Sequence, residues 1–244
     1  MKSTAPKIGF DRYIQLDWAE TALKIRAGSA SIDDLNALLD AAELTVAAKK
    51  KVRTVLNRLW LEPRPELADF ANRGIAIFKA NPAVSTAALC WGVAIATYPF
   101  FGKVADLVGR LTSLQGDCTS AEVHRRMSEL YGEREGTYRM TNMVLQSQAS
   151  WGAIERTDKG KRVIRRSAMR LTDAQIVAWV VEAALRYAGK AMAVPTLQSM
   201  PLIYPFVLDQ SLAYVASKSA KLEIRTEGSN SQFVGLREET ASTN

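Results

Sequence analysis

The chain has 244 residues, of which 48% are hydrophobic and 23% are charged, and its formal net charge is +7. This composition is typical of a folded protein with a real core, and it excludes a largely disordered chain. The positive surplus favours polyanionic partners, either nucleic acid or an anionic membrane surface, without specifying a fold.

The two cysteines, Cys90 and Cys118, have no CxxC or Cys/His spacing around them. We therefore expect reduced thiols in a cytoplasmic protein that holds no metal ion and no other cofactor. The uncharged stretch 83–101 is barely long enough to cross a membrane, and its serine, threonine and proline residues weaken it as a span. We expect a buried helix there and no membrane partner, with a membrane-associated protein as the alternative.

Helical periodicity dominates residues 7–101, which we predict to be a bundle of about five helices. Ser31 and Thr45 are suited to cap two of these helices, and Pro65 suits the first turn of another. The last helix, 83–98, is apolar nearly all round, so the other helices must surround it. The sequence thus predicts a mainly α protein whose first part is a helical bundle.

Residues 102–170 have the layout of a winged helix-turn-helix. Three helices are expected, followed by two short strands joined at Asp158-Lys159-Gly160, which is a favourable hairpin turn. The helices are predicted at 103–114, 121–131 and 136–150.

The third helix of this unit is the element expected to enter the major groove of DNA. Met140 and Val144 can face inward, which leaves a polar face toward the base edges. Arginine and asparagine, here Arg139 and Asn142, are side chains that can pair bidentately with guanine and adenine. The outward face is predicted to contain Thr137, Tyr138, Arg139, Thr141, Asn142 and Gln146.

Basic residues surround this helix in the sequence. Between 156 and 170 they outnumber the single acid Asp158, and a basic hairpin beside the third helix suits phosphate contacts of low sequence specificity. The alternatives for the hairpin are a solvated edge or a contact with another protein. A second basic cluster lies at 45–61, and it could equally be a solvated helical face. The residues predicted to bind nucleic acid are Arg125, Arg126, Arg139, Asn142, Lys159, Lys161, Arg162, Arg165 and Arg166, with Lys50 and Lys51 from the second cluster.

Residues 171–236 are predicted to be a C-terminal helical segment with two short strands. An amphipathic helix is expected at 172–191. Prolines then divide 194–208 into short apolar pieces, for which a core position and an exposed surface for a protein partner both remain open. A shorter helix is expected at 210–217 and the strands at 221–226 and 232–236. The chain ends, 1–6 and 237–244, are expected to be disordered.

The sequence has no glycine-rich phosphate loop, HExxH, GxSxG or paired-carboxylate signature, and we predict that the protein is not an enzyme. The single histidine, His124, precedes two arginines whose charge opposes its protonation, and we expect it on the surface or against a phosphate. Asp11, Asp17 and Glu20 lie close together in sequence and leave a metal-dependent nuclease as an alternative.

The order of these features resembles the BrxA family of bacteriophage-exclusion (BREX) systems. The resemblance covers residues 31–166 and rests on the segments KKKVRTVLNRLWLEP, ATYPFFGKVADLV and TNMVLQSQASWGAIERTDKGKRV. It implies a helical bundle similar to that of the antitermination factor NusB, followed by a winged-helix region. It also implies a non-enzymatic accessory protein of a phage-defence locus that binds double-stranded DNA, with Arg139, Asn142 and the hairpin cations as contacts. The alternative is a scaffold or adaptor that uses the winged helix and the C-terminal segment to bind other subunits of a defence complex.

Overall fold

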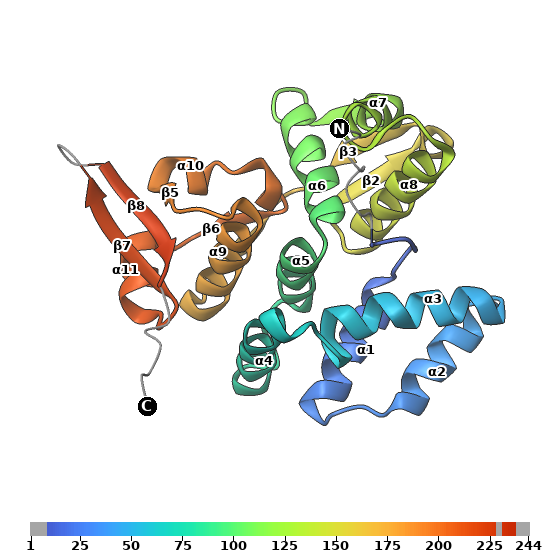
Figure 1. Cartoon of the computed structure of the whole chain (residues 1–244), viewed down its shortest axis with the longest axis horizontal. Coiled ribbons are helices and arrows are strands. Elements are labelled where there is room, and N and C mark those ends of the chain that lie inside the picture. The colour runs from blue at the N-terminus through green and yellow to red at the C-terminus, as the bar shows by residue number, and fades with distance from the viewer. Residues whose placement is uncertain (1–8, 228–230, 238–244) are drawn as a thin grey trace, which may run out of the picture.

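The computed structural model describes residues 9–227 and 231–237, and the chain is mainly helical with small sheets (Figure 1). Disorder was predicted for residues 1–6 and 237–244, and all of these except Arg237 lie outside the described ranges. Arg237 is described, and its backbone N–H donates to the carbonyl of Lys221 at 2.8 Å. The prediction of a mainly α protein is confirmed.

The first part of the chain forms five α-helices, as its periodicity indicates. The predicted caps are confirmed, because the side chains of Ser31 and Thr45 accept hydrogen bonds from the backbone N–H groups of Asp34 and Ala48. Pro65 occupies the first turn of its helix. The helices are α1 (Leu16–Ala27), α2 (Ile32–Ala41), α3 (Val46–Leu56), α4 (Pro65–Ala80) and α5 (Thr86–Thr97), and a π-helical turn (Asn57–Leu61) extends α3.

The apolar helix α5 lies at the centre of the molecule (Figure 1) and is buried over most of its length, as predicted. The next helix, α6 (Pro99–Leu111), starts directly after it, because Pro99 cannot continue α5 but suits the first turn of a new helix. No single helix in the described part of the chain is long and apolar enough to cross a membrane. Only α5 and α6 taken together reach that length and hydropathy, and they are bent by 116°.

A small three-stranded sheet follows α6. It consists of β1 (Asp117–Thr119), β2 (Ile154–Thr157) and β3 (Arg162–Arg165), in the antiparallel order β1-β3-β2. Helices α7 (Ser120–Tyr131) and α8 (Glu135–Ser150) lie between β1 and β2 in the chain. The turn at Asp158-Lys159-Gly160 joins β2 to β3 as predicted, whereas β1 lies between two predicted helices, where no strand was predicted.

The C-terminal part contains the predicted long helix α9 (Ala174–Ala188) and two more small sheets. One pairs β4 (Met169–Leu171) with β6 (Phe206–Leu208) in parallel, and the other has the order β5-β8-β7. In the proline-rich segment 194–208, Leu197 and residues 202–206 are buried and belong to the core, whereas residues 195, 196, 198, 199 and 207 are exposed. The remaining elements are β5 (Met192–Ala193), α10 (Val194–Gln198), a 3₁₀ turn (Pro201–Ile203), α11 (Leu212–Lys218), β7 (Leu222–Glu227) and β8 (Ser231–Leu236).

Trp179 of α9 fixes the C-terminal part to the helical bundle. Its ring is stacked on Phe70, with centroids 4.3 Å apart, and lies parallel to Trp60 on the bundle side. A Cβ atom at Gly92 of α5 would lie 2.2 Å from the Trp179 ring, so only glycine admits the indole there. One contiguous hydrophobic core therefore includes residues from all three predicted segments.

Candidate nucleic-acid interface

An open groove of about 1260 Å³ lies between the start of α7, one face of α8 and the β2–β3 hairpin. It combines aromatic, amide and basic side chains from elements that are far apart in the sequence. Its lining includes Ser120, Glu122 and His124 from the α7 region, Tyr138, Asn142 and Gln146 from α8, and Arg156, Asp158, Lys159, Lys161 and Arg162 from the hairpin.

The hairpin turn is held against the start of α7. The Ser120 hydroxyl donates to the carbonyl of Gly160 at 2.5 Å, and the Ser120 backbone N–H donates to the carbonyl of Lys161 at 2.8 Å. Thr119 caps α7 reciprocally with Glu122, whose carboxylate accepts the Thr119 N–H at 2.9 Å. These bonds fix one wall of the groove before any ligand binds.

The face of α8 that lines the groove is formed by Tyr138, Asn142 and Gln146. They follow one another at four-residue intervals, which places them on one side of a helix. Thr137 and Thr141 were expected on this outward face but are fully buried. The Thr141 hydroxyl donates to the Thr137 carbonyl at 2.8 Å, so its polar group is satisfied within the helix and its methyl group packs inward.

His124 is buried rather than on the surface, where it was predicted. Its ring stacks on Tyr138 with centroids 3.9 Å apart, and its Nδ1 atom has no hydrogen-bond partner among the residues that the structure describes. Burial lowers the pKa of His124 to about 4, and the charge of Arg156 acts in the same direction. Protonation is therefore opposed, as predicted, although the main cause is burial and not the neighbouring arginines in the sequence.

This pKa makes the stability of the fold depend on pH. The unfolded chain takes up a proton on His124 near pH 6.5 and the folded chain only near pH 4, so lowering the pH across this window favours unfolding. We expect His124→Phe, which keeps an aromatic ring against Tyr138, to remove about 2 kcal/mol of this pH dependence between pH 7 and pH 4.5. Urea denaturation of both proteins at pH 7 and pH 4.5 measures it. Equal losses of stability in the two proteins would contradict the assignment.

Arg156 belongs to the basic hairpin segment but is not among the residues predicted to bind nucleic acid. Its Nη2 atom donates to Asn142 Oδ1 at 2.7 Å and to the carbonyl of Gly160 at 3.0 Å. Burial lowers its pKa, although not enough to remove the charge of a guanidinium. Arg156 therefore bridges the hairpin and α8, a long-range contact for which the local sequence contains no signal.

Of the predicted cations, the structure brings Lys159, Lys161 and Arg162 to the groove. Both lysines are exposed and make no ion pair within the described part of the chain. Arg162 pairs with Asp117, to which its Nε donates at 2.7 Å. The lining contains four cations, Arg156, Lys159, Lys161 and Arg162, against the three acids Asp117, Glu122 and Asp158, so the groove has an excess of one positive charge.

The other predicted arginines do not line the groove. Arg165 donates to the carbonyl of Tyr204 at 2.7 Å and lies over that residue's ring, so it joins the hairpin to the C-terminal part. Arg166 is 3.7 Å from Glu155, and Arg125 and Arg126 both lie within 4 Å of Glu129, at 2.7 and 3.8 Å. Arg139 is exposed on α8 beside the lining face.

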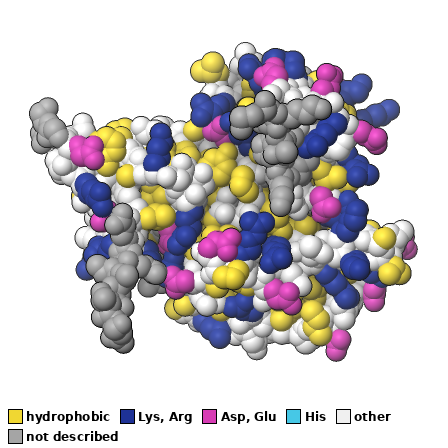
Figure 2. Space-filling model, viewed as in Figure 1, with side chains coloured by type: hydrophobic (Ala, Val, Ile, Leu, Met, Phe, Trp, Pro, Cys, Tyr) yellow, Lys and Arg dark blue, Asp and Glu magenta, His cyan; other side chains and the backbone are white. Residues whose placement is uncertain are grey.

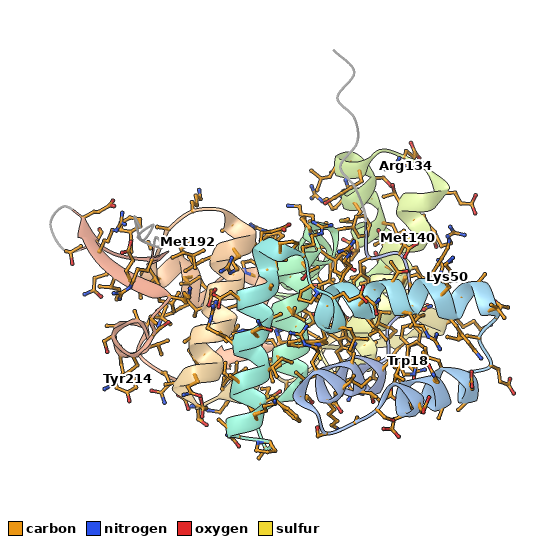
Figure 3. The ribbon with its side chains drawn as sticks, turned by 60° about the horizontal axis from the view of Figure 1, so that its bottom comes forward. Trp18, Lys50, Arg134, Met140, Met192 and Tyr214 are labelled. Atoms are coloured by element: carbon orange, nitrogen blue, oxygen red, sulfur yellow. The ribbon has the colours of Figure 1, made fainter. Side chains whose placement is uncertain are left out.

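Lys50 and Lys51 are exposed on α3 and also lie outside the groove. Helices α3 and α8 are nevertheless on the same side of the molecule in Figure 1, and Lys and Arg side chains follow that edge in Figure 2. Figure 3 places Lys50 on the same side as Met140 of α8, with Met192 and Tyr214 toward the opposite end. A ligand longer than the groove could therefore reach α3.

The acidic residues near the N-terminus are not gathered into a metal site. Asp17 accepts the backbone N–H of Trp18 at 2.9 Å, and Glu20 accepts the hydroxyl of Thr86. Within residues 9–227 and 231–237, no three His, Cys, Asp or Glu side chains are placed to hold a metal ion. Comparisons of the chain with protein-family models, with curated proteins and with solved structures give no match.

Proposed function

We propose that this chain binds double-stranded DNA through a winged helix-turn-helix formed by α6, β1, α7, α8, β2 and β3. In this arrangement α8 enters the major groove, and the β2–β3 hairpin is a short wing that contacts the adjacent phosphates. The order of helices and strands, with the sheet order β1-β3-β2, supports this assignment.

The observation that carries the proposal is the composition of the groove beside α8. Tyr138, Asn142 and Gln146 present polar groups at one-turn intervals, and Lys159 and Lys161, which make no ion pair with any described residue, line the groove from the hairpin. Amides suit base edges and lysines suit phosphates, and a DNA-binding face needs both kinds of group within reach of one duplex.

We further propose a cytoplasmic accessory role without catalysis, in a phage-defence locus such as the resemblance to the BrxA family implies. The alternative of a scaffold was motivated by the apolar segment 194–208. Five of its large apolar side chains are buried and Val207 is 42% exposed, so the segment offers little exposed apolar surface to a partner. DNA binding is therefore the function that the geometry favours.

A fluorescence-anisotropy titration tests the proposal, with a labelled duplex of about 30 base pairs at several salt concentrations. We expect the logarithm of affinity to fall linearly with the logarithm of salt concentration, with a slope of about −0.9 for each phosphate contact. Absence of binding at low salt would contradict the proposal. It would make a protein partner the next candidate.

A further inference from the structure

The contact between Arg156 and Asn142 determines which atoms Asn142 presents to a ligand. Nη2 of Arg156 lies 2.7 Å from the Asn142 side-chain amide. A guanidinium carries only N–H donors, so the amide atom that faces it must be the carbonyl oxygen. The NH₂ group of Asn142 then has no hydrogen-bond partner within the described residues, and Asn142 lines the groove.

The guanidinium is held in place by the hairpin turn as well as by α8. The Gly160 carbonyl accepts from both Arg156 and the Ser120 hydroxyl. A Cβ atom at Gly160 would lie 2.8 Å from Arg156 Nη2, so the glycine leaves room for the arginine. Asn142 is therefore oriented before DNA is bound, which is the condition for a specific contact.

We infer that Arg156 makes Asn142 a hydrogen-bond donor toward DNA, so that Asn142 prefers guanine or thymine to adenine on the strand it reads. This inference rests on the proposed function. An asparagine that recognises adenine accepts from the N6 amino group and donates to N7 at the same time. In this chain the guanidinium already occupies one lone pair of Oδ1, and an adenine amino group that donated to the other would bring its hydrogens beside a positive charge. Guanine N7 and O6 and thymine O4 are acceptors, which suit the free NH₂ group.

Selection of bound sequences from a pool of randomised duplexes tests this inference. The position read by Asn142 is the one whose base preference disappears in Asn142→Ala. At this position we expect the wild-type protein to enrich guanine or thymine over adenine by about tenfold or more. A preference for adenine at this position would overturn the inference.

Two further variants separate the orientation of Asn142 from a general loss of structure. Arg156→Met removes the guanidinium and frees Oδ1, so adenine should rise to at least the level of guanine. Asn142→Asp keeps an acceptor for Arg156 but has no NH₂ group, so the protein should fold as before and lose the preference for guanine or thymine. If Arg156→Met does not fold, Asn142→Asp still decides the question, because an unchanged preference in it contradicts the inference.

The same selection distinguishes this inference from the proposed function. If the wild-type protein binds no duplex, both are wrong. If it binds duplex DNA but no position depends on Asn142, only the inference about Asn142 is overturned.

Discussion

Lys159→Glu combined with Lys161→Glu is expected to weaken binding to duplex DNA by about a hundredfold or more. Each lysine is exposed at the groove without an ion pair, and its loss removes a charged hydrogen bond to a phosphate that contributes about 1.5 kcal/mol or more. The introduced carboxylates add repulsion. Anisotropy titration at fixed low salt measures the effect, and circular dichroism checks that the helical content is unchanged.

Lys50→Glu combined with Lys51→Glu is the matched control, because it changes the net charge by the same amount on α3. These lysines lie outside the groove, so we expect a clearly smaller loss of affinity. Equal losses in the two double variants would mean that the duplex depends on α3 as much as on the hairpin, and the groove would lose its assignment as the main DNA-binding surface.

Trp179→Ala is expected to lower the free energy of unfolding by about 3 to 5 kcal/mol. The indole is almost fully buried between Phe70 and Trp60, and its Nε1 donates to the carbonyl of Phe70 at 3.2 Å. Removing it leaves a cavity between α4, α5 and α9 and removes the additional hydrogen bond to the Phe70 carbonyl. Urea denaturation followed by circular dichroism measures the change.

Ile32→Ala is a suitable comparison for Trp179→Ala, because Ile32 is 50% exposed at the start of α2. We expect this substitution to change the free energy of unfolding by no more than about 0.5 kcal/mol. A loss below about 1 kcal/mol in Trp179→Ala would show that α9 contributes little to the stability of the bundle.

The parts of the fold that depend on local chemistry were predicted well from the sequence. Ser31 and Thr45 cap helices through bonds to backbone groups only three residues away, and Pro65 acts through its own ring. The turn at Asp158-Lys159-Gly160 likewise depends on neighbouring residues. Such signals are complete within a few residues, so a single sequence contains them.

The parts that depend on distant partners were not predicted. Strand β1 exists because Cys118 pairs with Val163 on β3, and three residues are too few for an alternating pattern. Arg165 was assigned to DNA because its sequence neighbours are basic, yet its guanidinium contacts the Tyr204 carbonyl. The sequence likewise offers no sign that Arg156 holds Asn142. The position of the hairpin and its basic character were therefore predictable, but the contacts that each of its cations makes were not.

The most direct test of the DNA-binding surface is photo-crosslinking from two exposed tyrosine positions. Tyr138 on α8 and Tyr214 on α11 are 60% and 49% exposed, and Figure 3 shows Tyr214 far from the α8 end of the molecule. Each is replaced in turn by the photoreactive residue p-benzoylphenylalanine, and the protein is irradiated with a labelled duplex of about 30 base pairs. We predict a crosslink from position 138 and none from position 214. Crosslinking from position 214 alone, or from neither position although the duplex is bound, would contradict the assignment of the groove to DNA.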